Sequence, residues 1–141
     1  MIRKANAEWK GPLKEGSGVV STESGALKTV PYNFVSRFET GDQTNPEELI
    51  AAAHSGCFSM ALANLLSEAG FVPESVATTA SAELSKGEDG FAIRKIHLDV
   101  EGKVPNISEA DFLSHAENAK AGCPISKSLT AEITMTARLV N

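Results

Sequence analysis

The sequence has little of what several classes of protein require. Basic side chains number 13 against 18 acidic ones, and the net charge of −5 leaves no basic face for a nucleic-acid backbone. The two cysteines and three histidines contain none of the closely spaced pairs of a zinc signature, so no metal is expected. The first ten residues, MIRKANAEWK, lack the apolar core of a secretory signal, which predicts a cytoplasmic protein.

Long apolar runs are missing as well. The most apolar stretch, residues 49–66, is interrupted by four polar side chains: His54, Ser55, Ser59 and Asn64. A membrane span needs about 20 predominantly apolar residues in a row. We therefore expect neither a membrane nor a nucleic acid as a partner.

What is present is the composition of a soluble globular domain. Hydrophobic residues make up 42% and charged residues 22% of the 141 residues, near the average for such proteins. A chain of this size buries roughly 68–70% of the surface that it exposes when unfolded. The sequence therefore predicts a single domain over residues 1–141 with a core of its own.

The strongest local pattern is a long helix in the middle of the chain. Asn45 is a good N-cap, and Glu47 and Glu48 complement the positive end of the helix that follows it. Gly70 is a natural place for the helix to stop. Small and apolar residues surround nearly the whole circumference over residues 51–66, which is typical of a buried central helix.

Strands are predicted on both sides of this helix. Residues 2–10 and 32–38 are strand candidates before it, and apolar and polar residues alternate after it over residues 76–84, 91–100 and 131–140. The glycine-rich residues 11–25 predict a hairpin or loop. In the segment 91–100 the alternation slips at Arg94–Lys95, where a bulge is expected.

A second helix is predicted to begin after Ser108 and to end at Gly122, and Cys123–Pro124 then opens a short helical turn. The order of strands, buried helix, hairpin, helix and strand predicts an α+β fold.

Two cysteines are the candidates for chemistry, and a structural disulfide between them is not expected in a cytosolic protein. Cys57 lies in the middle of the long helix, where burial raises its pKa, so it becomes a nucleophile only beside a positive partner. Cys123 lies at the start of a helical turn, where a thiolate is favoured and leaves readily. The alternative is two inert thiols, since free cysteine is among the most buried residue types.

Arg37 and His54 could supply the positive partner. His54 precedes Cys57 by three residues and shares its face of the helix, although a lone helical histidine is more often a packing residue. Glu47 precedes Cys57 by ten residues, roughly 15 Å along a straight helix, so it reaches a Cys57 site only from a second copy of the chain. Alternatively, Glu47 and Glu48 only stabilise the start of the helix, and the residues alone favour this simpler role.

The motifs together resemble the OsmC/Ohr family. The resemblance rests on RFE (37–39), TNPEELIAAAHSGCFSMAL (44–62) and KAGCPIS (120–126). The segments STESGAL (21–27), EAGF (68–71) and AEIT (131–134) point to its OsmC branch, named for osmotically inducible protein C. The match covers essentially the whole chain, and the NPEEL…C segment with GCP at this distance is highly specific.

The resemblance implies a thiol-dependent peroxidase, an oxidoreductase that reduces organic hydroperoxides, and hydrogen peroxide less well, in antioxidant defence under osmotic and oxidative stress. It implies an OsmC-like fold with curved antiparallel sheets that wrap long central helices in an intertwined homodimer. Cys57 matches the peroxidatic cysteine and Cys123 the resolving one. Arg37 and Glu47 match the polar pair that activates the thiol, and the family supplies part of this pair from the partner subunit.

No cofactor is implied beyond an external dithiol reductant, such as a lipoylated protein. Four apolar side chains are expected to suit a hydrophobic peroxide tail: Leu49, Ile50, Phe58 and Met60. The alternative function is a non-enzymatic redox sensor or binding module, in which the thiol pair switches a partner interaction.

Overall fold

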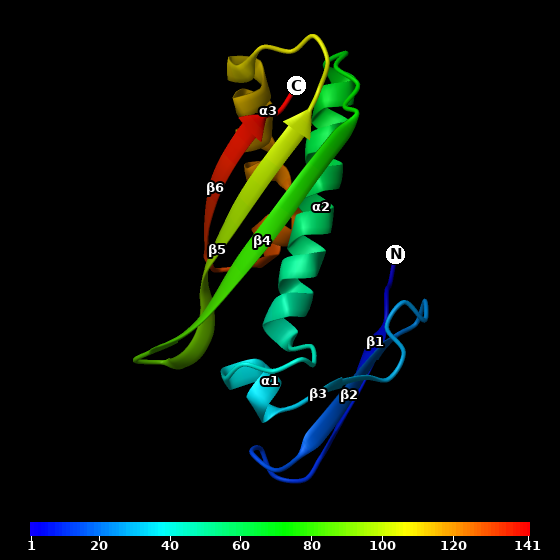
Figure 1. Ribbon diagram of the computed structural model, residues 1–141, viewed down its shortest axis with the longest axis vertical. Coiled ribbons are helices and arrows are strands. Elements are labelled where there is room, and N and C mark those ends of the chain that lie inside the picture. Colours follow the sequence, from blue (N-terminus) through cyan, green and yellow to red (C-terminus); the bar gives the residue numbers. More distant parts are fainter. The chain divides into compact units, whose positions relative to one another are not determined.

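The computed structural model describes all 141 residues, which form two compact units, residues 1–49 and 50–141. Each unit contains one three-stranded sheet (Figure 1). Helices and strands are both present, so the predicted α+β class is confirmed. The single domain over residues 1–141 stays a prediction.

The sheet of the first unit is antiparallel. Its strands are β1 (Ala5–Lys10), β2 (Ser17–Thr22) and β3 (Val30–Tyr32). Gly18 pairs with Trp9 on one side and with Tyr32 on the other, and the two rings meet over it at a centroid distance of 5.4 Å. A Cβ at Gly18 would lie 2.6 Å from the Tyr32 ring, so this cross-strand aromatic contact depends on the glycine.

The predicted strand over residues 32–38 is wrong beyond its first residue. The chain leaves β3 at Tyr32 and forms the short helix α1 (Phe34–Phe38). Oδ1 of Asn33 accepts from the N–H of Ser36 at 2.8 Å, and Oγ of Ser36 accepts from the N–H of Asn33 at 3.0 Å. This reciprocal cap starts a helix in a segment whose apolar residues also alternate.

The long helix α2 (Pro46–Glu68) begins as predicted, with Oδ1 of Asn45 accepting from the N–H of Glu48 at 2.8 Å. It continues into the second unit, whose sheet contains β4 (Ser75–Gly87), β5 (Gly90–Lys103) and β6 (Glu132–Leu139). Between β5 and β6 the chain forms α3 (Glu109–Gly122) and α4 (Pro124–Ser128).

This second sheet is mixed, which corrects the expectation of antiparallel sheets alone. β4 and β5 form an antiparallel hairpin, whereas β6 pairs in parallel with β5. The parallel pairing follows from the helical connection through α3 and α4, which returns the chain to the end of the sheet where β5 began. The predicted bulge is confirmed: Glu83 pairs with Lys95 and Leu84 with Ile93, which leaves Arg94 as the extra residue.

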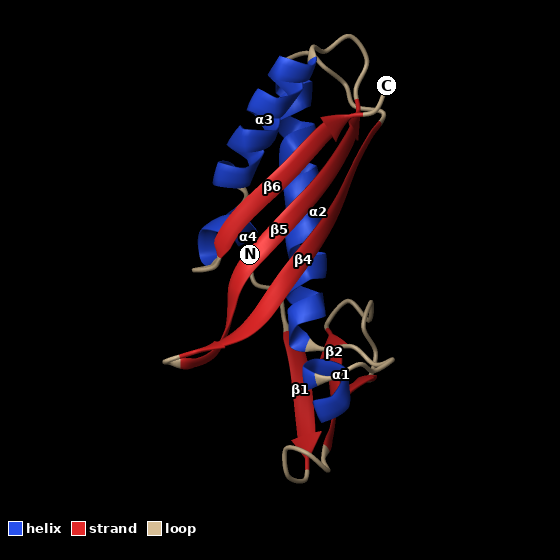
Figure 2. Cartoon of the chain, turned by 60° about the vertical axis from the view of Figure 1, so that its left-hand side comes forward, coloured by secondary structure: helices blue, strands red, loops and turns tan.

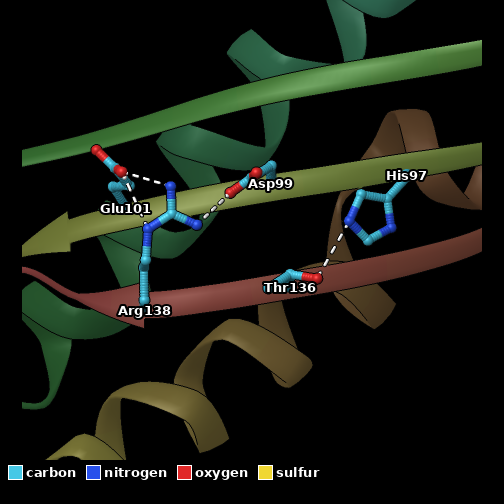
Figure 3. Close-up of polar contacts among 5 residues, drawn as sticks. All are labelled: His97, Asp99, Glu101, Thr136 and Arg138. Carbon is cyan, nitrogen blue, oxygen red and sulfur yellow. Dashed lines mark hydrogen bonds and ion pairs between the residues drawn. The ribbon is translucent and has the colours of Figure 1, made fainter.

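Helices α2 and α3 cover one face of the second sheet (Figure 2). The core between them contains Phe58, Leu62 and Leu66 of α2, Phe112 and Ala116 of α3, and Ile96, Leu98 and Val100 of β5. The other face of the sheet is polar. Figure 3 shows Arg138 of β6 paired with Asp99, at 2.8 Å, and with Glu101 of β5.

The expectation that α2 is buried all round is wrong for a single chain. His54, Phe58, Leu62 and Leu66 are fully buried, but Met60 on another face is 76% exposed. The helix has 23 residues and a mean hydropathy of 1.5 over its most apolar window, of which 22% is buried, so by length and composition alone it could cross a membrane. Within the second unit, one sheet and one further helix cover only one face of α2, which leaves its other apolar face without a partner in that unit.

Candidate functional site

The two cysteines come together in the second unit. Cys57 projects from α2, and Cys123 lies at the junction of α3 and α4, where it is the N-cap residue of α4 without a side-chain capping bond. Both are free thiols, Cys57 partly buried and Cys123 fully buried. The two thiols lie close enough for each to shift the pKa of the other. Two cysteines this near are placed to form a disulfide between α2 and the junction of α3 and α4.

The surroundings shift the pKa values of the two thiols in opposite directions. Burial raises the pKa of Cys57, and the neighbouring Cys123 raises it further, while the N–H of Ile125 opposes the rise. Burial also disfavours the Cys123 thiolate, but the N–H of Ser126, the thiol of Cys57 and the hydroxyl of Ser126 together lower the pKa of Cys123. Both directions agree with the sequence analysis. No cation contributes to the pKa of Cys57 within the chain.

His54 does not bond to Cys57, although it lies one turn away on α2. Its Nε2 is 2.7 Å from Oγ of Ser126 in α4, and burial lowers the pKa of the imidazole. Nδ1 is buried without a hydrogen-bond partner. Sequence reasoning missed Ser126 because nothing in a single sequence links two residues 72 positions apart.

Arg37 and Glu47 meet in the first unit. Nε and Nη2 of Arg37 donate to the same carboxylate oxygen, Oε1 of Glu47, at 3.2 and 3.0 Å. The Glu47 side chain is 11% exposed and that of Arg37 is 38% exposed. The second carboxylate oxygen, Oε2, is buried without a partner. The guanidinium also stacks over the Phe38 ring at 5.2 Å.

The short helix α1 places Arg37 beside Glu47. Oγ of Ser36 donates to the carbonyl of Thr44 at 2.9 Å, and Nδ2 of Asn45 donates to the carbonyl of Ser36 at 3.0 Å. These two bonds hold the end of α1 against the start of α2. The buried carboxylate then receives its charge partner from the last turn of α1.

The expected apolar pocket does not form from its four residues. Phe58 is fully buried in the core and Met60 is 76% exposed, while Leu49 lines a separate cavity of about 160 Å³ in the first unit. A larger cavity of about 420 Å³ in the first unit is lined by aromatic side chains and Arg37. Its aromatic residues are Trp9, Tyr32, Phe34 and Phe38. No local signal in the sequence indicates it, because strand pairing and α1 bring these residues together.

The structure thus pairs the four expected site residues two by two. Arg37 and Glu47 belong to the first unit, and Cys57 and Cys123 belong to the second. No group of three or more histidine, cysteine, aspartate or glutamate side chains is placed to hold a metal ion.

Comparison with known proteins identifies the family. The family model described as "OsmC-like protein" matches residues 39–138. The chain is 53% identical to peroxiredoxin OsmC of Escherichia coli strain K12 over 97% of its own length and 96% of that protein. The chain belongs to the OsmC-like family. The predicted resemblance is therefore confirmed.

Solved structures agree on the fold of this OsmC-like chain. An OsmC-like protein of unknown function from Vibrio cholerae superposes with a TM-score of 0.78 at 17% identity, covering 98% of this chain and 99% of that one. The organic hydroperoxide resistance protein OhrB of Bacillus subtilis has a TM-score of 0.72 at 22% identity, with 97% and 98% covered. At these identities the likeness shows the OsmC-like fold.

Proposed function

We propose that the protein is a thiol-dependent peroxidase that reduces organic hydroperoxides to alcohols. The observation that carries the proposal is the proximity of Cys57 and Cys123, close enough for each to shift the pKa of the other. The chain is 53% identical to a protein named peroxiredoxin over nearly its full length, and other relatives are named organic hydroperoxide resistance proteins. Paired thiols of this kind support peroxide reduction followed by disulfide formation.

The reaction has three steps. The thiolate of Cys57 attacks the distal oxygen of the hydroperoxide, the O–O bond breaks, and the alkoxide takes a proton and leaves as the alcohol. The sulfenic acid on Cys57 then reacts with Cys123, which gives an intramolecular disulfide and water. An external dithiol, such as a lipoylated protein, reduces this disulfide and is itself oxidised. No resident cofactor or metal takes part.

The first step needs a cation beside Cys57. Burial and Cys123 raise the pKa of Cys57, and no cation of the same unit opposes this. The guanidinium of Arg37, held by Glu47, is the cation proposed to favour the thiolate. Because Glu47 and Cys57 are ten residues apart on α2, roughly 15 Å at the rise of an α-helix, we propose that the pair comes from a second copy.

We therefore propose an intertwined homodimer with residues 1–141 as its single-domain protomer. The support within the chain is the uncovered face of α2, where Ala53, Gly56 and Met60 are exposed at helical spacing. Small residues at two of these positions allow a second helix to approach closely. A dimer that covers this face needs no membrane, which is consistent with a cytoplasmic location and a role in oxidative and osmotic stress defence.

The aromatic cavity supports organic rather than hydrogen peroxide as substrate. It lies beside Arg37 and is lined by Trp9, Tyr32 and Phe34. Apolar surface of this kind gains from the burial of an aryl or alkyl group. Hydrogen peroxide has no such group, so it is proposed to be the poorer substrate.

The activity is tested by consumption of cumene hydroperoxide with excess dithiothreitol. We expect rapid turnover by the wild type, none by Cys57→Ser, and a single round of oxidation by Cys123→Ser that stalls before an intramolecular disulfide forms. Full activity of Cys57→Ser would overturn the assignment of the nucleophile. No turnover by the wild type would favour the redox sensor.

Sharing of the site between copies is tested by mixing two inactive variants. Arg37→Ala keeps Cys57, and Cys57→Ser keeps Arg37. If the cation comes from the partner, co-refolding equal amounts restores about a quarter of the wild-type activity, because half of the dimers are mixed and each has one complete site. If the cation comes from the same chain, the mixture stays inactive.

A further inference from the structure

A buried polar contact joins α2 to α4 beside the two thiols. His54 is fully buried, and its Nε2 lies 2.7 Å from Oγ of Ser126. Ser126 is the third residue after Cys123, the N-cap residue of α4, so its hydroxyl lies one helical turn from that thiol. The hydroxyl is near enough to lower the pKa of Cys123, and Cys57 shifts the same pKa. An imidazole, a hydroxyl and two thiols therefore lie together in one cluster.

The bond to Ser126 is the only polar contact of the His54 ring. Nδ1 is buried without a partner, and burial lowers the pKa of the ring, which favours the neutral imidazole with a single N–H. With this hydrogen on Nε2, the ring donates to Oγ of Ser126, and the serine hydrogen is left to point at Cys123. A side chain that only filled space would be better apolar, because the unpartnered Nδ1 carries a desolvation penalty.

Charged side chains do not enter this cluster. Lys120 on α3 pairs with Glu117 at 2.7 Å, and Lys127 on α4 is exposed. No charge contributes to the pKa of His54. Among the titratable groups, only the thiols of Cys57 and Cys123 interact with one another here, so the pH dependence of the cluster belongs to them.

We propose that His54 is a positioning residue for the resolving step, in which it holds the Ser126 hydroxyl so that this hydroxyl donates to the sulfur of Cys123. The inference rests on the proposed function and extends it to a residue outside the expected catalytic set. It also gives His54 a role through Ser126 and Cys123 instead of a direct one on Cys57.

The chemistry of both disulfide steps uses this donor. In the forming step, the Cys123 thiolate attacks the sulfur of the Cys57 sulfenic acid. The S–S bond forms, the S–O bond breaks, and the departing hydroxide takes a proton from solvent. In the reducing step, a dithiol thiolate attacks the Cys57 sulfur and Cys123 leaves as a thiolate. A hydroxyl that donates to this thiolate favours both steps.

The test measures formation and reduction of the Cys57–Cys123 disulfide with oxidised and reduced dithiothreitol over a range of pH. With oxidised dithiothreitol, the Cys123 thiolate attacks a mixed disulfide on Cys57 in place of the sulfenic acid and expels the dithiothreitol thiolate, so the same attacking sulfur is tested. We expect Ser126→Ala and His54→Leu to slow both steps by about tenfold, the scale of one lost hydrogen bond to a charged group, and to move the midpoint of the pH profile upward. Ser126→Thr and His54→Gln keep a donor and should recover most of the rate and the original midpoint.

Two results would overturn the proposal. One is a wild-type rate and midpoint in Ser126→Ala. The other is a loss in His54→Leu that leaves the midpoint unchanged and is not recovered in His54→Gln, which would indicate packing alone. If His54→Leu does not fold, the comparison of Ser126→Ala with Ser126→Thr tests the proposal in its place. The assay contains no hydroperoxide, so it gives its answer even if the wild type proves not to be a peroxidase.

Discussion

The close packing of α3 on the second sheet predicts a steric clash for any side chain added at Gly102. Gly102 of β5 lies under the ring of Phe112, and a Cβ there would be 2.3 Å from Cε2 and 2.4 Å from Cζ. Carbon atoms prefer separations of about 3.5–4.0 Å, so the ring must shift by about 1 Å or more. Phe112 is fully buried and cannot move toward solvent. We expect Gly102→Ala to lower the free energy of unfolding by about 2–3 kcal/mol, the upper part of the range for overpacking a core.

The assay is urea unfolding at one fixed protein concentration. Gly122→Ala is the matched control, because a Cβ at this end of α3 meets nothing within 4 Å; it should be neutral or stabilise by up to about 1 kcal/mol. In a Phe112→Leu background the ring is gone, so Gly102→Ala should cost less than about 1 kcal/mol. Equal costs of Gly102→Ala in both backgrounds, or a neutral effect in the wild type, would refute the packing argument.

Arg37→Lys keeps the charge but loses the two N–H donors to one carboxylate oxygen, so kcat/KM for cumene hydroperoxide should fall about tenfold or more. An unchanged value would contradict the role of this two-donor contact. Leu62→Ala removes a fully buried side chain and should cost about 2–5 kcal/mol in urea unfolding, and a cost under about 1 kcal/mol would mean that α2 does not pack there. Arg138→Gln breaks the ion pairs to Asp99 and Glu101, whose side chains are 47% and 46% exposed, so urea unfolding should change little; a clear loss of stability would show that these surface pairs matter. Ser126 lowers the pKa of Cys123 through its amide and its hydroxyl, and Cys57→Ser leaves both groups in place and puts a hydroxyl where the thiol was. We expect the pKa of Cys123 to stay below its unfolded value in this variant, so stability should rise with pH between the folded and unfolded pKa values and be lost as pH falls through that window; a flat profile would contradict the shift.

Patterns in the sequence predict those helices and strands whose form depends on interactions between residues that are near neighbours in the chain. Asn45 and the apolar run after it define α2, and the slip in alternation at Arg94 predicts the bulge that the pairing of β4 and β5 contains. The helix α1 was missed because the alternation of its apolar residues is as good for a strand, and only the reciprocal bonds between Asn33 and Ser36 favour a helix. The parallel pairing of β6 was missed because its pairing partner is set by the connection and not by its own residues.

The candidate site shows the same difference between features set by near neighbours in the sequence and features set by distant residues. The chemistry of Cys57 and Cys123 follows from their places on helices, but their mutual contact joins residues 66 positions apart and was implied only by the family resemblance. The pairing of Arg37 with Glu47 also came from the resemblance, because it depends on α1. Ser126 had no signal at all, since its role depends on its distance to His54.

The hydrogen-bond donors around the two thiols favour the thiolate of Cys123 over that of Cys57. The amide and hydroxyl of Ser126 both favour the Cys123 thiolate, whereas Cys57, in the middle of α2, has a single backbone donor against burial and a neighbouring sulfur. Within one chain these contributions make Cys123 the thiol that ionises more readily, the opposite of what an attack of Cys57 on peroxide requires. A cation that reverses this order must stabilise the Cys57 thiolate by more than these donors stabilise that of Cys123. A guanidinium can do so at short range, because charge–charge attraction in a partly desolvated site exceeds single neutral hydrogen bonds. Once Cys57 has been oxidised the cation has no thiolate to stabilise, and the same donors then favour Cys123 as the attacking thiolate.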